Sequence, residues 1–113
     1  MKIYSLEKID ELSGGDPEFA EAIVTAFLEE TPQDLDSLQE GIVSEDYTTI
    51  YQSAHKLKPN VDLLGVSELH ANILKMESMA RSNAEMEHLK QLFVEVKATM
   101  NDLLNQLKRD FDH

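Results

Sequence analysis

The sequence predicts an all-α protein, an antiparallel four-helix bundle with a short additional N-terminal helix. Apolar residues recur at steps of three and four along the long segments, and no segment shows the alternation of a β-strand. Short polar breaks separate the segments, as is typical of antiparallel helices joined by short loops. A chain of 113 residues can bury roughly two thirds of its unfolded surface, so we expect one domain over residues 1–113.

The first predicted helix is short and lies in the stretch "YSLEKIDEL". Ser5 is suited to the N-cap, because its side-chain oxygen can accept a hydrogen bond from a free backbone N–H group. Leu6, Ile9 and Leu12 form the apolar face of this helix. The stretch "SGG" then ends it.

The stretch "GDPEF" predicts the start of a long helix, with Asp16 as the N-cap and Pro17 at the first helical position. Pro32 interrupts the apolar spacing without shifting its phase, so we expect one kinked helix that continues to Val43. Its apolar positions are Ala20, Ile23, Phe27, Leu35, Leu38 and Ile42.

Three further helices are expected after residue 43. The stretch "SED" restarts a helix that Gly65 ends, and Ser67 is suited to cap the next helix. In "RSNAE", Ser82 and Glu85 have the spacing of a capping box, which predicts a turn before the last helix. The apolar positions of the three helices are Ile50, Ala54, Leu57, Val61 and Leu64, then Leu69, Ile73, Met76 and Ala80, and finally Leu89, Leu92, Val96, Met100, Leu103 and Leu107.

The composition excludes several classes of function. The formal net charge of −12, from 22 acidic and 10 basic residues, repels nucleic acid and anionic membranes. No cysteine is present, so disulfides and thiolate metal sites are impossible. No run of residues has the pattern of a signal peptide or the length of a membrane span, so we expect a cytoplasmic protein.

The charge is unevenly distributed around one histidine. Residues 47–61 contain no acidic residue, although 22 acidic residues in 113 predict about three in a window of this size. The window contains Lys56 and Lys58, so His55 lies in a locally cationic part of an acidic chain, which suits a transient negative charge. A chance distribution of charge is the alternative interpretation.

Helical geometry directs His55 outward. With about 100° per residue and the apolar positions set to zero, His55 falls at about 140°, Lys58 at about 80° and Pro59 at about 180°. Pro59 cannot donate a hydrogen bond to the His55 carbonyl, which predicts a bend or loosening there; a tolerated kink without purpose is the alternative. Leu63 falls at about 220°, away from the apolar face, and is either an ordinary exposed leucine or part of a docking surface.

The residue pattern favours one kind of chemistry over the others. No arrangement of serine, base and carboxylate is recognisable, and no glycine-rich phosphate loop is present. A di-iron site in a helical bundle needs two Glu-x-x-His pairs, but only Glu85 and His88 have that spacing, so we expect no metal site. A surface histidine can be a solvated bystander, but a neutral imidazole is also a good nucleophile near neutral pH, so His55 fits a covalent carrier.

Several features together resemble the histidine-containing phosphotransfer (Hpt) domains of multistep phosphorelays, over most of the chain. They are "SGGDPEF" before a long helix, then "SED", then "AHKLK", and "LG" nine and ten residues after the histidine. Met76 and Glu77 lie where the family usually has a leucine followed by glutamate or glutamine. Each feature is weak by itself, but their order and spacing together are specific.

The resemblance implies that His55 is the phosphoacceptor, which receives a phosphoryl group from an aspartate of one receiver domain and passes it to another. It also implies that Lys58 neutralises the phosphoryl oxygens and that Glu77 can hold the other imidazole nitrogen. Such domains have no kinase or phosphatase activity of their own and need no cofactor, because the receiver brings the magnesium ion. The implied partners are receiver domains of response regulators or hybrid histidine kinases.

One stretch departs from the family pattern. After the lysine the family usually has glycine and then small residues, whereas here the run is proline, asparagine, valine and aspartate. Pro59 and Asn60 are compact enough for docking, but Asp62 is expected near the histidine, where its charge could oppose an incoming phosphate. We expect Lys56, Pro59, Asp62 and Leu63 to belong to the docking surface.

Two alternatives to a phosphotransfer module stay open, namely a helical-bundle interaction protein without phosphotransfer and a metalloprotein. We expect a monomer. Met1 and the complete helices favour a free-standing protein over the C-terminal domain of a hybrid kinase. The sequence names neither the partner kinase and regulator, nor the pathway, nor the direction of phosphoryl flow.

Overall fold

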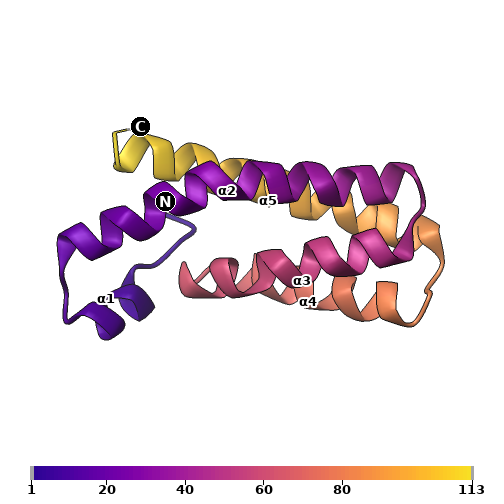
Figure 1. The fold of residues 1–113 in the computed structure, drawn as a ribbon, viewed down its shortest axis with the longest axis horizontal. Helices are drawn as coiled ribbons and strands as arrows, with labels where there is room; N and C mark the ends of the chain where they lie inside the picture. The colour runs from indigo at the N-terminus through magenta and orange to yellow at the C-terminus, as the bar shows by residue number, and fades with distance from the viewer. Residues whose placement is uncertain (1, 113) are drawn as a thin grey trace.

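The computed structural model describes residues 2–112, and this part of the chain is all-α, as predicted. Four long helices pack together and a short helix precedes them (Figure 1). The helices are α1 (Glu7–Ser13), α2 (Pro17–Val43), α3 (Tyr47–Leu63), α4 (Ser67–Arg81) and α5 (Met86–Asp110).

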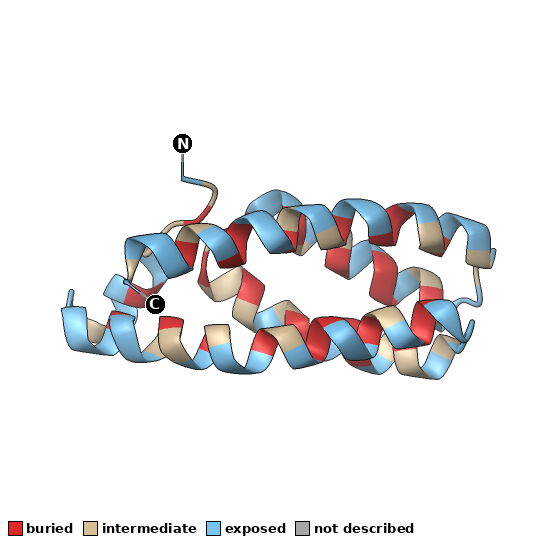
Figure 2. Cartoon of the chain, turned by 90° about the horizontal axis from the view of Figure 1, so that it is seen from above, coloured by how far each residue is buried: buried red, intermediate tan, exposed pale blue. Residues whose placement is uncertain are grey.

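The four long helices form a closed bundle in which each helix packs against two neighbours. The packed pairs are α2 with α3, α3 with α4, α4 with α5 and α5 with α2. The result is an elongated molecule of 43 × 23 × 23 Å, with the buried residues along the inner faces of the helices (Figure 2). Within residues 2–112, no helix is both long and apolar enough to cross a membrane.

The buried side chains form one core, and the predicted apolar positions of α3, α4 and α5 all belong to it. In α2 the prediction holds except at Ile23, which is half-buried against the core. In α1 the prediction is wrong at Leu12, which is 71% exposed, whereas Ile9 is fully buried. The reason is that α1 is short and contacts the bundle over only a few residues, so only one turn of its apolar face is buried.

Asp16 is the N-cap of α2, as the sequence predicts, but the predicted serine caps are not formed. Asp16 accepts a hydrogen bond from the Glu18 N–H, and Asp46 caps α3 in the same way. Ser67 is already inside α4, because the preceding residue, Val66, is buried in the core and occupies the cap position. The predicted capping box is absent from the described structure.

The two other serines lie next to the helix ends rather than at the predicted caps. Ser5 lies one residue before the cap of α1, although its Oγ still accepts a hydrogen bond from the Glu7 N–H at 3.2 Å. Ser82 ends α4, and its Oγ donates to the Met79 carbonyl at 3.2 Å. Glu85 takes the cap position of α5.

Both long helices that contain proline continue through it. Helix α2 runs unbroken past Pro32, as predicted, with its N-terminal part inclined toward α1 in Figure 1. Helix α3 likewise runs past Pro59 to Leu63. The lost backbone hydrogen bond therefore does not end α3, and His55 lies inside this helix.

The chain before α1 forms hydrogen bonds with the C-terminal ends of α3 and α5. The buried Tyr4 donates its hydroxyl proton to Asp110 at the end of α5, at 2.7 Å. Burial and the neighbouring carboxylate raise the pKa of Tyr4 to about 12. The Ser5 N–H donates to the Leu64 carbonyl at 2.7 Å. The next residue, Gly65, has a φ of +67°, which allows the turn after α3 to pass close to Ser5.

Candidate functional site

The exposed side of α3 forms a ridge that runs along the bundle between α2 and α4. Because α3 packs against both of these helices, both flanks of the ridge are covered and only its crest faces solvent. We define the α3 ridge by the exposed residues Thr48, Gln52, His55, Lys56 and Pro59.

His55 lies near the middle of this ridge, with its side chain 60% exposed, as the helical angle predicted. Its Nδ1 atom is 2.6 Å from the Glu77 Oε2 atom on α4. Because a carboxylate can only accept, this contact favours, for the neutral imidazole, the tautomer with its proton on Nδ1 and its lone pair on Nε2. The neighbouring helix therefore favours one tautomer of an exposed histidine.

Glu77 also binds Lys58, which lies one turn after His55 on α3. The Lys58 Nζ atom donates to both carboxylate oxygens, at 3.2 and 3.3 Å. Burial raises the pKa of Glu77, but hydrogen bonds from His55 and Lys58 outweigh this effect and hold the pKa below its usual value. Glu77 is therefore a charged, nearly buried group shared by the two side chains.

Tyr51 and Arg81 complete the surroundings of the imidazole, and neither was predicted to have a role. The Tyr51 ring stacks on the His55 ring, with centroids 5.8 Å apart and planes inclined by 14°. Arg81 donates from Nη2 to the Tyr51 hydroxyl at 2.8 Å. The signal available in the sequence is spacing, because Tyr51 precedes His55 by four residues and Arg81 follows Glu77 by four.

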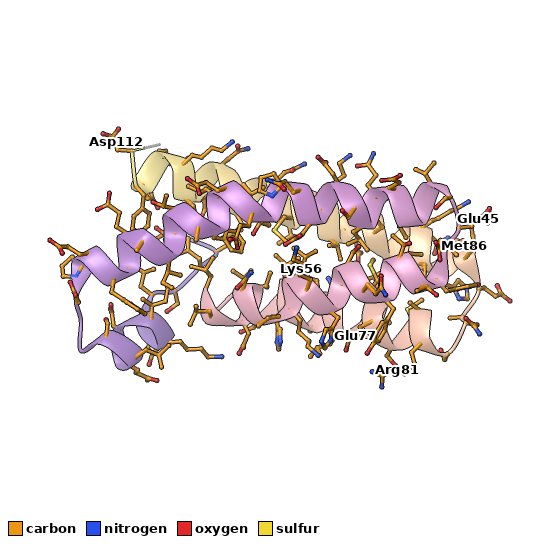
Figure 3. All side chains as sticks on the ribbon, in the orientation of Figure 1. Glu45, Lys56, Glu77, Arg81, Met86 and Asp112 are labelled. Carbon is orange, nitrogen blue, oxygen red and sulfur yellow. The ribbon has the colours of Figure 1, made fainter. Side chains whose placement is uncertain are left out.

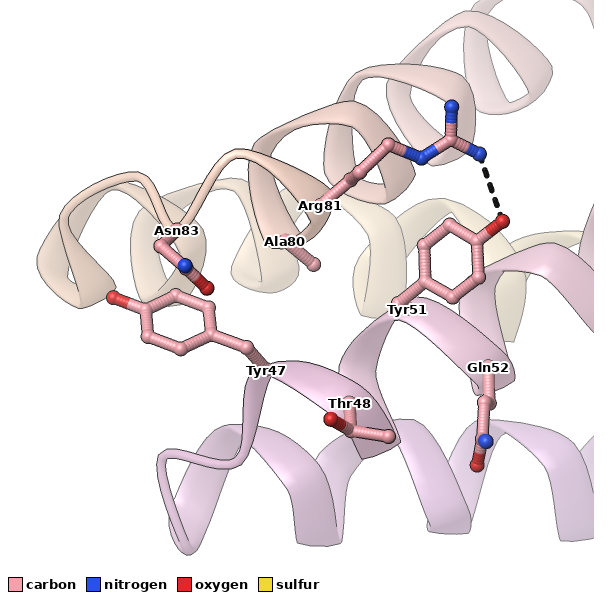
Figure 4. Close-up of a pocket in the computed structure, with 7 residues that line it drawn as sticks. All are labelled: Tyr47, Thr48, Tyr51, Gln52, Ala80, Arg81 and Asn83. Atoms are coloured by element: carbon pink, nitrogen blue, oxygen red, sulfur yellow. Dashed lines mark hydrogen bonds between the residues drawn. The ribbon is translucent and has the colours of Figure 1, made fainter.

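A cavity of about 360 Å³ lies beside this cluster, between the start of α3 and the end of α4. Figure 4 shows Tyr47 and Tyr51 on the α3 side, Arg81 and Asn83 on the other, and the hydrogen bond from Arg81 to Tyr51. The Tyr47 hydroxyl donates to the Ala84 carbonyl at 2.6 Å. Both tyrosines are thus held at their hydroxyl groups, but only Tyr51 reaches the imidazole.

Of the predicted docking residues, Lys56 lies on the α2 flank of the ridge. Its Nζ atom is 2.9 Å from an oxygen of Asp34, a buried carboxylate of α2. This hydrogen bond, together with the charge of Asp34, raises the pKa of Lys56. Figure 3 shows Lys56 between α3 and α2, whereas Glu77 and Arg81 lie on the α4 side.

The opposite flank contains Asp62, whose charge is compensated. The Lys8 Nζ atom donates to Asp62 at 2.6 Å, and His70 Nδ1 lies 3.9 Å from the same oxygen. The hydrogen bond from Lys8 lowers the pKa of Asp62. The expectation that Asp62 presents an opposing negative charge beside His55 is therefore corrected, because Asp62 is paired with α1.

The expected outward direction of Leu63 is wrong. Leu63 is half-buried, packs against the core and lines a small cavity of about 70 Å³ with Ile23, Phe27 and other residues. The physical reason is that α3 has two neighbours, so its buried arc extends toward α2 beyond the stripe of fully buried residues. Pro59, by contrast, is exposed on the ridge.

The positive charges around His55 are matched by acidic residues of other helices. The window 47–61 has no acidic residue in sequence, yet Glu77 binds Lys58 and Asp34 binds Lys56. Charge counting along one helix missed both pairs, because the partners come from α2 and α4. Within residues 2–112, no group of three or more histidine, aspartate or glutamate side chains is arranged to hold a metal ion.

Comparison with known families connects this geometry to a function. The sequence matches the Hpt domain family over residues 22–110, which includes α3, α4, α5 and most of α2. This chain belongs to the Hpt domain family. Hpt domains are phosphocarriers that carry out histidine phosphotransfer and interact with receiver domains in phosphorelays. No match was found among curated proteins or among solved structures.

Proposed function

We propose that His55 is the phosphoacceptor of this Hpt domain and that it relays a phosphoryl group between receiver-domain aspartates. The observation that carries the proposal is the 2.6 Å contact between Nδ1 of His55 and Glu77. In the neutral imidazole this contact favours a free lone pair on Nε2, and the His55 side chain is 60% exposed. A nucleophile of this kind needs no base to remove a proton before it attacks.

The proposed step is a transfer between two nucleophiles. Nε2 of His55 attacks the phosphorus of an aspartyl phosphate, a new N–P bond forms, and the O–P bond to the aspartate breaks. The aspartate leaves as a carboxylate. Nδ1 of His55 keeps its proton, and the positive charge on the imidazole is balanced by the Glu77 carboxylate, which accepts the hydrogen bond from Nδ1. The reverse step returns the phosphoryl group to the aspartate of a second receiver. The magnesium ion belongs to the receiver.

Lys58 supplies the cation for the phosphoryl oxygens in this proposal. It lies one turn from His55, and its ammonium group already lies beside Glu77, next to the imidazole. Electrostatic stabilisation of transferred phosphoryl groups by lysine is a general feature of phosphoryl transfer. The function of Glu77 is therefore twofold: it orients the imidazole and holds Lys58 close to the reaction.

We propose that the receiver docks across the α3 ridge. Pro59 has no long side chain and leaves space beside His55, while Lys56 lies on the α2 flank. Asp62 and Leu63 lie farther along α3 and would contact the edge of the receiver. We also propose that the protein acts as a monomer, because the α3 ridge needs no second copy to be complete. We propose a cytoplasmic location as well, since this is typical of Hpt domains.

The first prediction concerns the acceptor residue. Phosphorylated receivers are screened for transfer to the protein, and the label is expected on His55 as an acid-labile, base-stable phosphoramidate. His55→Gln abolishes the label, because the amide cannot act as a nucleophile. His70→Gln and His88→Gln, which change the two other histidines within residues 2–112, are the matched controls and retain it.

Two results would contradict this assignment. Label that persists on the folded His55→Gln protein would place the phosphoryl group elsewhere. Stable binding of receivers with no transfer to the wild-type protein would favour the alternative, an interaction protein without phosphotransfer.

A further inference from the structure

The imidazole of His55 has a second contact that differs in kind from its hydrogen bond to Glu77. Tyr51 lies one turn earlier on α3, and its ring lies nearly parallel to the imidazole, with the two centroids 5.8 Å apart. An inclination of 14° makes this an offset-stacked pair rather than an edge-to-face contact. Glu77 contacts the edge of the imidazole, and Tyr51 stacks beside its face.

Tyr51 is itself fixed from α4. Arg81 donates to the Tyr51 hydroxyl at 2.8 Å, and its guanidinium carbon lies 5.1 Å from the centroid of the same ring. The tyrosine is also partly buried against the core. The ring that stacks on the imidazole is therefore held by a hydrogen bond at its hydroxyl, by the guanidinium over its face and by packing against the core.

Edge and face contacts restrict different motions of the imidazole. A hydrogen bond at Nδ1 fixes one atom, but it still allows the ring to tilt about that atom. A stacked ring opposes this tilt, because it fixes the plane in which the imidazole lies. With both contacts in place, the direction of the Nε2 lone pair is determined, and correct orientation of the attacking atom accounts for a large part of catalytic rates.

We propose that Tyr51 is a positioning residue for phosphotransfer, which holds the plane of the His55 imidazole and is itself held by Arg81. This inference rests on the proposed function of His55 and extends it to a pair of residues from α3 and α4. Tyr51 acts through the imidazole, not through contact with the phosphoryl group. Its effect is therefore independent of which receiver docks.

The first test observes the ring without any phosphorylation. The His55 C–H proton resonances are recorded by NMR for the wild-type protein, Tyr51→Leu and Tyr51→Phe. Loss of the aromatic ring in Tyr51→Leu removes its ring current, so the His55 resonances shift, whereas they stay close to wild type in Tyr51→Phe. Tyr47→Leu is the matched control, because Tyr47 lies one turn earlier on α3, lines the same cavity and does not stack on His55.

The second test measures reactivity with a small donor, phosphoramidate. Nε2 attacks its phosphorus and ammonia leaves, so no receiver surface takes part and docking effects are removed. The phosphorylation rate of His55 is expected to fall about three- to tenfold in Tyr51→Leu, the range that the free energy of a stacked aromatic pair allows. It stays within about twofold of wild type in Tyr47→Leu. Thermal midpoints confirm that each variant is folded.

A double-mutant cycle tests the contribution of Arg81. Tyr51→Phe breaks the hydrogen bond alone, whereas Arg81→Ala removes the hydrogen bond and the contact with the ring, so Arg81→Ala lowers the phosphoramidate rate at least as much as Tyr51→Phe. The double variant is no slower than Arg81→Ala, because both contacts are already lost there. If the two effects multiply, Arg81 acts independently of Tyr51, and the proposed link through Tyr51 is overturned.

The outcomes separate this inference from the function on which it rests. Absence of an adduct on wild-type His55, from both phosphoramidate and phosphorylated receivers, overturns the proposed function and the positioning role together. Normal labelling of the wild-type protein with an unchanged rate in folded Tyr51→Leu overturns the positioning role alone. An unchanged phosphoramidate rate with slower transfer from receivers also overturns it, because Tyr51 would then be a docking contact.

Discussion

At the scale of single residues, the Glu77 carboxylate accepts hydrogen bonds from both His55 and Lys58. The cation proposed to meet the phosphoryl group is therefore bound to a carboxylate while the histidine is unmodified. An incoming phosphoryl group has to compete with Glu77 for Lys58. The advantage is position, because the ammonium group is held within one turn of the nucleophile instead of moving freely in solvent.

The second prediction measures the contribution of Lys58. Lys58→Ala is expected to slow transfer from a receiver about tenfold, which corresponds to about 1.4 kcal/mol of transition-state stabilisation. The thermal midpoint changes little, since Lys58 is outside the core. Lys108→Ala is the matched control, because it removes an exposed lysine from the last turn of α5, outside the α3 ridge. An equal loss of rate in both variants would show a general effect of charge, not a specific one.

At the scale of the element, α3 shows what helical periodicity can and cannot predict. The spacing identified the four fully buried positions of this helix, the buried Leu64 at its C-cap, and the outward direction of His55. It failed at Leu63, because periodicity gives the direction of the core but not the width of the buried arc. That width depends on how many helices pack alongside, and α3 has a neighbour on each flank.

The third prediction follows from the corrected position of Leu63. Leu63→Ala is expected to lower the free energy of unfolding by about 1–2 kcal/mol, roughly half the cost of a fully buried leucine. Receiver binding by the folded protein falls only slightly. The control is Leu12→Ala, since Leu12 is 71% exposed and its truncation costs within about 0.5 kcal/mol. A large loss of binding with unchanged stability would contradict this position and make Leu63 a main docking contact instead of an edge contact.

Helix ends were predictable where a carboxylate caps them and unpredictable where packing decides. Asp16 and Asp46 have the residue type and the following sequence of an N-cap, and both accept backbone hydrogen bonds. Ser67 has the residue type as well, but burial of Val66 shifts the start of α4 by one residue. Local sequence contains no information about that burial.

At the scale of the whole molecule, the site exists only because α3 and α4 lie side by side. The contact of the imidazole with Glu77 on α4 does not follow from spacing, since Glu77 is 22 residues from His55 in the chain. Glu77 was found through the family resemblance, and its role stays a proposal. Arg81 was missed, because nothing in the motif around His55 refers to the end of α4.

The fourth prediction concerns the dependence of overall stability on pH. The pKa of Glu77 is lower in the folded protein than its usual value of about 4.3. Its ionised form therefore stabilises the fold above that value, and this contribution disappears as the pH falls through the lower, folded pKa. Glu77→Gln lacks the contribution at every pH.

The measurement is the urea midpoint of both proteins between pH 7 and about pH 3. The difference in stability between the wild-type protein and Glu77→Gln is expected to be constant near neutral pH and to shrink below about pH 4.3. A difference that does not change down to pH 3 would show that Glu77 is not stabilised in its charged form.

The contact between Tyr4 and Asp110 has a consequence for the connectivity of the chain. It brings the beginning of the described chain to the end of α5, so a short peptide linker could join the two ends into a ring. New termini could then be opened in the turn at residues 82–85, at the opposite end of the bundle. In such a circular permutant α5 would come first in the chain, while α3 and α4 would stay joined by their own short turn. The order of the helices along the polypeptide is thus separable from the pairing of α3 with α4 that brings His55 to Glu77.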